Sequence, residues 1–381
     1  MLMSADLDAV RAHLSAAGEA ASPTSVAGAL TELGLVVSDE AVRLLLAAIR
    51  REGHGAGPLE PLLQYPGVTD VLVNGPDEVW IDRGQGLERT EVRFTDDDAV
   101  RRLAVRLAAL AGRRLDDAIP FADARLPGGI RVHAVLPCVA DQTCVSLRVP
   151  VASALSLEDW VRGGGLTELG RDLLAALIVQ RRAILISGGT GSGKTTLLAS
   201  LLGAVDHADR LVLVEDSREL RPTHPHVLHL EARNANAEGV GAVTLTDLVR
   251  HALRMRPDRI VVGEVRGAEL RDLLAALNTG HEGGLGTVHA NTAQAVPARL
   301  EALGALGGLG RAALHAQVAA ALDAVIHVRR GSQGRRYVGE IGVVVNDDRG
   351  LVQVVPAVTW SEDGVCQNGA ARAVLESWVS A

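Results

Sequence analysis

The chain has 381 residues, and this length predicts two domains, or three small ones, rather than a single domain. Its formal net charge is −8, and an acidic balance argues against a protein that mainly coats nucleic acid. The three cysteines have no C-x-x-C spacing, so the sequence predicts free thiols rather than a disulfide framework or a zinc site. The first residues lack the basic and apolar regions of a signal peptide, and no apolar run is long enough to span a membrane. We therefore expect a cytoplasmic protein.

Residues 1–57 open the chain with apolar residues at helical spacing, which predicts a helical N-terminal extension. Residues 58–150 mix strand patterns with one helix, predicted over 97–114, that begins acidic and ends basic. This second segment therefore predicts a compact α+β domain. Residues 151–167 include serines and a triple glycine, and we place a linker there.

Residues 168–381 have a different pattern, in which short apolar runs alternate with helical segments. The runs lie at 183–187, 211–215, 259–264 and 324–330. Short, fully apolar runs between helices are typical of the buried parallel strands of an α/β domain. The sequence therefore predicts an α/β fold for this third segment.

The only lysine of the chain is Lys194, and the other 37 of its 38 basic residues are arginine. A GC-rich genome explains a general preference for arginine, but it does not explain the exception. Lysine carries a compact point charge on a flexible stem, which the broad planar guanidinium of arginine does not replace. Lys194 therefore marks a position that needs a compact positive charge.

A glycine-rich segment around Lys194 follows the apolar run 183–187 and precedes an amphipathic helical pattern. It fits G-x-x-x-x-G-K-T in the expected strand–loop–helix context, which argues against a chance match by a glycine-rich turn. We expect its backbone N–H groups to bind phosphate, Lys194 to reach the β- and γ-phosphates, and the Thr195 hydroxyl to bind Mg²⁺. The predicted nucleotide-binding residues are Gly188, Gly189, Thr190, Gly191, Ser192, Gly193, Lys194, Thr195 and Thr196.

Acidic residues follow two of the predicted strands. Glu215, Asp216 and Glu219 come at the end of the run 211–215, and Glu264 ends the run 259–264. The carboxyl ends of strands in an open α/β sheet face the ligand crevice, so these acids can hold a metal ion or orient water. The alternative is that they cap the following turns or lie on the surface.

His281 and His289 lie eight residues apart among glycines and threonines. A zinc site would need a third ligand and a closer spacing. A buried or helix-capping histidine is the plain alternative. We favour a sensor of the γ-phosphate, in which a histidine or threonine of a mobile loop hydrogen-bonds to nucleotide.

The order of these motifs resembles the type II/type IV secretion ATPase superfamily. The segments LVRHALRMRPDRIVVGEVRG and NTGHEGGLGTVHANT are most similar to its tight-adherence (Tad/Flp pilus) branch, whose actinobacterial members are often labelled conjugal-transfer-associated ATPases. The similarity covers about residues 58–330. It implies that 168–381 form a RecA-like P-loop NTPase domain preceded by the smaller α+β domain.

The resemblance also implies roles for single residues. Lys194 and Thr195 match the Walker A pair, and Glu264 matches the Walker B glutamate, with Thr195 and Glu264 on the Mg²⁺ side. Glu219 matches the proposed catalytic base, and His289 belongs with His281 to the family's histidine box.

Arg125, Arg131 and Arg148 match arginines that the N-terminal domain of the family supplies to the nucleotide, although ordinary surface or interface arginines are the alternative. The chain departs from the family in one segment, because GGLGT replaces the common GSLTT and two hydroxyl groups are missing. This departure puts the detailed sensor chemistry in doubt.

The resemblance implies an ATP-driven motor with ATP and Mg²⁺ as its cofactors, assembled as a hexamer. It would act with membrane platform proteins at the inner face of the cytoplasmic membrane. The alternatives are a retraction or DNA-transfer motor of the same superfamily, a nucleotide-gated scaffold with little hydrolysis, and a helicase. The arginines between 101 and 114 could contact DNA, but a solvated helix face or a subunit interface is the simpler interpretation, and we expect no direct nucleic-acid binding.

Overall fold

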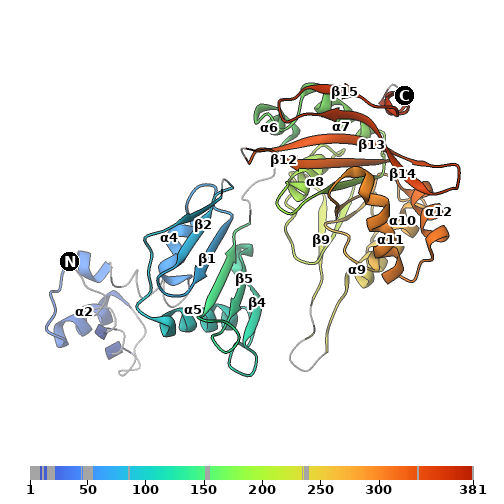
Figure 1. Cartoon of the computed structure of the whole chain (residues 1–381). Coiled ribbons are helices and arrows are strands. Elements are labelled where there is room, and N and C mark those ends of the chain that lie inside the picture. Colours follow the sequence, from blue (N-terminus) through green and yellow to red (C-terminus); the bar gives the residue numbers. More distant parts are fainter. Residues whose placement is uncertain are drawn as a thin grey trace. The chain divides into compact units, whose positions relative to one another are not determined.

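The computed structural model describes residues 9–10, 13–14, 22–43, 45, 55–84, 86–150, 155–233, 235, 240–332 and 334–379. The chain divides into two compact units, Met1–Val151 and Ala152–Ala381 (Figure 1). None of the helices in the described ranges is long and apolar enough to cross a membrane.

The described part of the N-terminal extension is largely helical and has its own small apolar cluster. Helix α2 (Pro23–Glu32) begins after Ser22, whose hydroxyl accepts a hydrogen bond from the Ser25 N–H. This capping contact satisfies a backbone donor that the helix itself leaves unpaired. Val26 and Leu30 of α2 are buried in the cluster, as Val10 and Leu14 are.

The α+β domain contains a six-stranded antiparallel sheet in the order β3-β2-β1-β6-β5-β4. Helix α5 packs on β4, β5 and β6, and it buries Val100, Leu103 and Leu107 in a core shared with the sheet. The strands are β1 (Asp70–Asn74), β2 (Val79–Asp82), β3 (Leu87–Arg89), β4 (Phe121–Arg125), β5 (Arg131–Val135) and β6 (Cys144–Arg148). The helices are η1 (Gly57–Leu59), α4 (Glu60–Leu63), α5 (Asp97–Leu110) and η2 (Pro127–Gly129).

The second unit is built on a nine-stranded sheet in the order β15-β14-β13-β12-β7-β11-β10-β8-β9. The strands from β12 to β9 in this order run parallel, and β13, β14 and β15 extend the sheet in antiparallel pairs. The strands are β7 (Ile184–Gly188), β8 (Leu211–Glu215), β9 (Val227–Glu231), β10 (Arg259–Val262), β11 (Leu285–His289), β12 (Ala324–Arg330), β13 (Arg336–Asn346), β14 (Val352–Trp360) and β15 (Cys366–Asn368).

Helices cover both faces of this sheet. One core contains side chains of α6, α7, α8 and α13, and the other contains side chains of α9, α10, α11 and α12. The helices are α6 (Leu157–Arg162), α7 (Glu168–Val179), α8 (Lys194–Gly203), α9 (Leu245–Ala252), η3 (Leu253–Met255), α10 (Glu269–Leu277), η4 (Ala293–Ala295), α11 (Val296–Leu306), α12 (Arg311–Ala321) and α13 (Arg372–Val379). Every residue of β7, β8 and β10 is buried, as expected for parallel strands covered on two faces. The α/β prediction is confirmed, and the C-terminal strands close the domain.

Two predicted boundaries need correction. Residues 157–162 fall in the predicted linker, yet they form α6, and Leu157 and Trp160 are buried in the core of the second unit. The Trp160 indole N–H also donates to Ser200 Oγ on α8 at 2.9 Å. Apolar burial therefore draws this segment into the second unit. The helix predicted over 97–114 ends at Leu110, and Gly112 then adopts a φ of 67°, which a continuing helix does not allow.

The arginines of α5 mostly meet acidic side chains nearby. Arg101 pairs with Asp117 at 2.8 Å, and Arg114, just beyond the helix, pairs with Asp116. These local ion pairs favour a solvated helix face over a DNA contact for α5.

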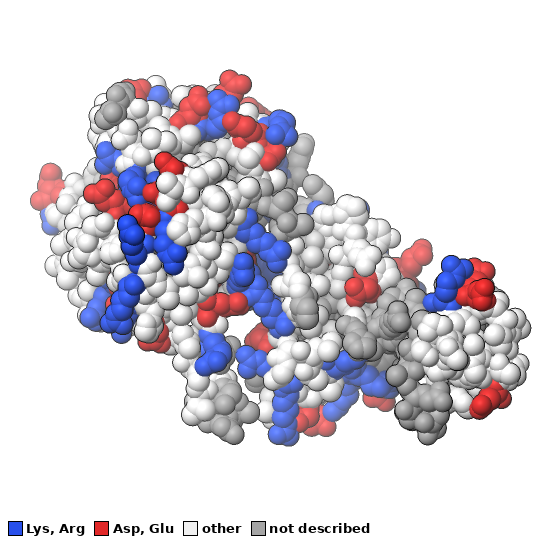
Figure 2. All heavy atoms as spheres, turned by 180° about the vertical axis from the view of Figure 1, so that it is seen from behind, with Lys and Arg blue, Asp and Glu red and all other residues white. Residues whose placement is uncertain are grey.

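Acidic and basic side chains are also interspersed over the second unit on the face shown in Figure 2.

A buried ion pair lies where the parallel strand β10 begins. Arg259 at the start of β10 is 2% exposed; its Nε lies 3.1 Å from Asp209 Oδ2, and its Nη2 donates to the Ile178 carbonyl oxygen at 2.9 Å. Replacing Arg259 with Met removes one of the two arginines that pair with the buried Asp209 carboxylate and leaves only Arg181. We expect the free energy of unfolding to fall by about 3 kcal/mol, measured by urea denaturation.

The matched control is Arg250→Met, because the arginine of the Arg250–Asp272 pair is 51% exposed, whereas the two carboxylates are similarly covered (Asp272 16% and Asp209 12% exposed). An exposed pair contributes less than about 1 kcal/mol. Equal losses in the two variants would contradict a structural role for the buried pair.

Candidate nucleotide-binding site

The predicted phosphate loop joins the end of β7 to the start of α8, as its strand–loop–helix context requires. Gly188 has a φ of 153°, and a Cβ atom there would lie 2.5 Å from the Val328 carbonyl oxygen. Gly193 has a φ of 101°, and a Cβ there would approach the Arg336 side chain to 3.1 Å. Glycine is therefore required at both ends of the loop, because a side chain would be strained and crowded.

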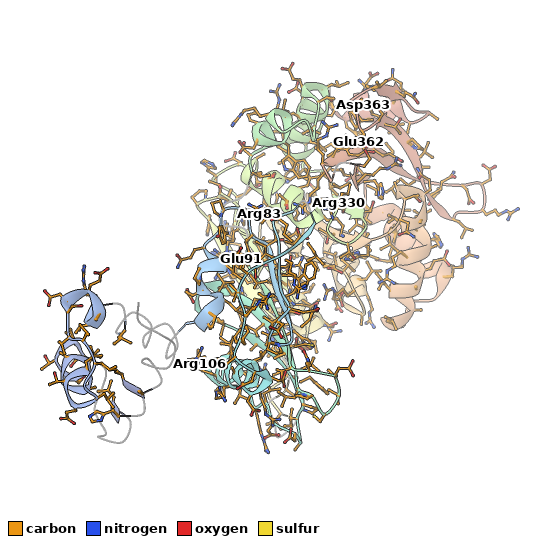
Figure 3. The ribbon with its side chains drawn as sticks, turned by 60° about the vertical axis from the view of Figure 1, so that its left-hand side comes forward. Arg83, Glu91, Arg106, Arg330, Glu362 and Asp363 are labelled. Carbon is orange, nitrogen blue, oxygen red and sulfur yellow. The ribbon has the colours of Figure 1, made fainter. Side chains whose placement is uncertain are left out.

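The outside of the loop is held by the hairpin that joins β12 and β13. Arg336 Nε donates to the Gly191 carbonyl oxygen at 3.0 Å. The Ser332 N–H donates to Glu362 Oε2 at 3.0 Å, which attaches the hairpin to the turn before β15. Figure 3 labels Arg330 at the end of β12 and Glu362 and Asp363 in that turn. These contacts fix the loop from the side of the C-terminal strands.

Lys194 is buried at the first position of α8 and is only 6% exposed. Its Nζ donates to the carbonyl oxygens of Gly188 at 3.1 Å and Gly189 at 2.8 Å, and it lies 3.3 Å from His289 Nδ1. Burial lowers the pKa of Lys194, while the negative charge of Glu264 acts in the opposite direction. The ammonium group therefore has three acceptors around it at the place where the motif puts phosphate.

His289 at the end of β11 connects Lys194 to Glu264. A protonated lysine can only donate, so Nδ1 of His289 must accept, and a neutral ring then carries its proton on Nε2. That nitrogen lies 3.2 Å from Glu264 Oε1. Burial and the positive charge of Lys194 lower the pKa of His289, which favours this neutral form. His289 thus accepts from the lysine, and its other ring nitrogen lies beside the glutamate.

Glu264 lies two residues beyond β10, and both of its oxygens have partners. Oε2 accepts from Arg266 Nη2 at 2.8 Å, and Arg266 Nη1 lies 3.3 Å from Asp216 Oδ2. Burial would raise the pKa of Glu264, but the Arg266 hydrogen bond and the nearby positive charges outweigh it and lower the pKa. The carboxylate is therefore ionised. The chain of contacts joins the carboxyl ends of β7, β11, β10 and β8, where open α/β sheets bind ligands.

The backbone before Glu264 is fixed by two side chains from neighbouring strands. Thr287 Oγ1 donates to the Gly263 carbonyl oxygen at 2.6 Å. Glu215 packs so closely that a Cβ on Gly263 would lie 2.8 Å from its Cγ. Glu215 Oε1 accepts from the N–H groups of Glu219 at 2.9 Å and Leu220 at 2.8 Å. Glu215 therefore caps the following turn, as one of the two alternatives for these acids predicts.

The remaining predicted site residues of the second unit lie in different environments. The Glu219 side chain is exposed on the turn after β8, and its charge contributes to raising the pKa of Arg266. His281 Nδ1 lies 3.3 Å from the Ala276 carbonyl oxygen, so this histidine caps the end of α10, whereas His289 reaches Lys194. Thr195 and Thr196 are half-buried in the first turn of α8.

The two missing hydroxyl groups of the GGLGT segment have a steric explanation. A Cβ on Gly284 would lie 2.3 Å from Leu277 Cδ2 and 3.1 Å from the Ile260 carbonyl oxygen. A Cβ on Gly286 would lie 3.2 Å from the Val262 carbonyl oxygen. A side chain at Gly284 would therefore have to displace Leu277, and one at Gly286 would be tight against the β10 backbone, so glycine suits both positions.

The three arginines of the first unit form a row across its sheet. Arg125 on β4 pairs in register with Arg131 on β5, and Arg131 pairs with Arg148 on β6. Residues in register share a face, and Arg148 also pairs in register with Asp70 on β1, so an acidic side chain continues the row.

Sequence reasoning missed two functional groups. Arg266 lies in the VGEVRG motif, and its position two residues after the predicted acid was the available signal. His327 on β12 is 2% exposed, and its Nδ1 lies 2.9 Å from Ser187 Oγ on β7. No local motif surrounds His327, so only the pairing of the two strands reveals it.

Fold and site together define a P-loop nucleotide-binding protein. Residues 52–368 match the type II/IV secretion system protein family, and the chain belongs to this family. A protein of Mycobacterium tuberculosis described as a conjugal transfer protein is 55% identical over 344 residues, covering 88% of this chain and 97% of the relative. Type IV secretion system protein PtlH of Bordetella pertussis is 33% identical over 312 residues, covering 73% and 90%. The fold is shared with the Legionella pneumophila ATPase DotB (TM-score 0.52, 21% identity, 74% of this chain and 78% of that chain).

The buried His327 makes the second unit sensitive to acid. Burial, aided by the charge of Arg329, lowers its pKa to about 4, against about 6.5 in an unfolded chain. Its contribution to stability is therefore complete above pH ~6.5 and is lost as the pH falls toward ~4, in total about 3 kcal/mol. We expect His327→Leu to flatten the dependence of the unfolding free energy on pH in this window, measured by urea denaturation.

The control is His315→Leu, which removes another buried histidine and keeps His327. This variant is expected to retain the part of the slope that His327 contributes between the two pH values, because His327 is still present. An unchanged slope in His327→Leu would contradict the assignment.

Proposed function

We propose that this chain hydrolyses ATP to power a pilus-assembly or secretion machine at the inner face of the cytoplasmic membrane. The observation that carries the proposal is the contact chain from Lys194 through His289 to Glu264 at the carboxyl edge of a parallel sheet. Such a site combines a phosphate loop, a metal-side carboxylate and a histidine that contacts both. Family membership supports the same conclusion.

The chain's own groups have separable roles in this reaction. The N–H groups of the loop and of the α8 N-terminus bind phosphate oxygens, and Lys194 exchanges its present acceptors for them. Glu219 orients or deprotonates the attacking water, and His289 senses the γ-phosphate. Arg125, Arg131 and Arg148 neutralise charge that develops in the transition state.

Mg²⁺ fits the oxygen donors of this site. Among the described residues, no group of three or more His, Cys, Asp or Glu side chains is placed to hold a metal ion. Mg²⁺ that accompanies a nucleotide usually takes one or two protein oxygens and completes its shell with phosphate and water. Thr195 and the ionised Glu264 provide oxygens of this kind, with Glu264 acting directly or through water.

We propose that the chain belongs to the tight-adherence (Tad/Flp pilus) branch of the family, which its motifs resemble. We propose that it assembles as a hexamer and works with membrane platform proteins. The strongest alternative is a conjugative DNA-transfer motor, which the description of the Mycobacterium tuberculosis relative favours. A retraction motor of the same superfamily is a further alternative. The local ion pairs around α5 speak against direct DNA binding by its arginines.

Substitution of Lys194 tests hydrolysis directly. Lys194→Ala and Lys194→Arg are both expected to reduce phosphate release at least about 10²-fold, because neither provides a compact charge in the buried pocket. Arg372→Gln, which alters the Arg372–Glu376 pair on α13, outside the phosphate loop and its contacts, should release phosphate at the wild-type rate. Equally negligible release from wild type and Lys194→Ala would instead support the nucleotide-gated scaffold.

Single-stranded DNA separates the motor from a helicase. We expect its addition at low salt to leave the rate of phosphate release unchanged, because the arginines of α5 mostly have acidic partners. Stimulation that weakens as salt rises would contradict this expectation, because counterion release makes nucleic-acid contacts salt-dependent.

A further inference from the structure

A row of buried polar side chains crosses the sheet behind the phosphate loop. Ser187 on β7 pairs in register with His327 on β12, and His327 pairs with Glu340 on β13. Their exposed fractions are 0%, 2% and 3%. The same face of the sheet otherwise contributes apolar residues such as Leu185 and Val325 to its core. Burying polar groups in an apolar core is costly unless they are hydrogen-bonded, so each member of the row needs a partner.

The His327 ring has polar partners in two different segments. Nδ1 lies 2.9 Å from Ser187 Oγ, and the ring also makes a hydrogen bond to the backbone of Asn291. The second bond favours the charged ring, so the ring donates to the Asn291 carbonyl oxygen. The neutral ring then accepts from Ser187 and donates to Asn291. A neutral imidazole has one acceptor and one donor nitrogen, so it can contact both Ser187 and Asn291.

Glu340 on β13 makes a second contact with the segment that contains Asn291, residues 289–295. Its Oε1 accepts from Gln294 Nε2 at 2.6 Å, and Gln294 lies in η4. Asn291 and Gln294 follow His289 by two and five residues. The segment 289–295 is therefore held to β13 by the part-buried Gln294–Glu340 hydrogen bond, and Asn291 contacts His327 of β12, immediately beyond the histidine that contacts Lys194.

The two partners of His327 adjoin the two sides of the Lys194–His289 contact. Ser187 immediately precedes Gly188, whose carbonyl oxygen accepts from Lys194. Asn291 lies on the segment that begins with His289. We propose that His327 is a positioning residue that holds His289 in place against Lys194 and Glu264, with Glu340 as a second tie. Its kinetic consequence rests on the proposed ATPase function, but the positioning itself does not.

Hydrogen exchange in the nucleotide-free protein tests the positioning without any activity. In His327→Leu, amides of segments 187–196 and 289–295 should exchange faster than in wild type, because Ser187 and Asn291 lose their partner. The matched control is His315→Leu. His315 is 3% exposed and also uses both nitrogens, with Glu301 Oε1 at 2.9 Å and the Val352 N–H at 2.8 Å. This control should leave both segments unchanged.

Ser187→Ala provides a second, milder variant in case His327→Leu does not fold. It removes only the hydroxyl group, and it should accelerate exchange in segment 289–295 to a smaller extent. Unchanged exchange in this segment in every folded variant, or equal acceleration in His315→Leu, would overturn the proposal.

Steady-state kinetics test the consequence for hydrolysis. In His327→Leu we expect kcat to fall by about tenfold to a hundredfold with little change in the KM for ATP. A displacement of about 1 Å can cost this much rate, whereas the phosphate loop still binds the ground state. His327→Gln, which keeps an acceptor and a donor, should recover part of kcat, whereas His315→Leu should keep both constants.

A rise in KM equal to the loss of kcat/KM, or no rescue by His327→Gln, would contradict a positioning role. If wild type does not hydrolyse ATP while His327→Leu still accelerates exchange in segment 289–295, the proposed ATPase function fails and the positioning stands.

Discussion

The site depends on one buried positive charge. An ammonium group removed from water is costly unless acceptors surround it, and Lys194 obtains them from Gly188, Gly189 and His289. The two carbonyl oxygens face the lysine only because the loop turns through a positive φ at Gly188. The third acceptor exists only while His289 is neutral. Loop geometry and histidine protonation are therefore both consequences of burying this charge.

The contacts beyond His289 follow from the order of the parallel strands. β7, β11, β10 and β8 are neighbours in the sheet, although their residues are far apart in the sequence. Their carboxyl ends therefore bring His289, Glu264 and Asp216 to one edge. Thr287 and Glu215 fix the backbone around Gly263 from the two flanking strands, which leaves Glu264 little freedom. The glycine-rich segment of β11 is the steric condition for such close strand packing.

Sequence reasoning found the parts of this arrangement that are local. Apolar runs predicted the parallel strands, and the loop motif identified Lys194. Strand-end position selected Glu264 but could not distinguish Glu215, which caps a turn, because that difference depends on packing against Gly263. The roles of Arg266 and His327 depend on partners from other strands. The short strand β3 and helix α6 were missed because neither has enough residues to establish a periodicity.

The balance of charge explains why the proposed reaction would need the arginine row. Arg266 is a positively charged neighbour of Lys194, but its guanidinium already forms ion pairs with Glu264 and Asp216. Using it for phosphate would break ion pairs and disturb Glu264, which the proposal places on the Mg²⁺ side. Lys194, the loop N–H groups and Mg²⁺ would then face the charge that spreads over the γ-phosphate oxygens in the transition state. Arg125, Arg131 and Arg148 would then add the further positive charge that the proposal assigns to them.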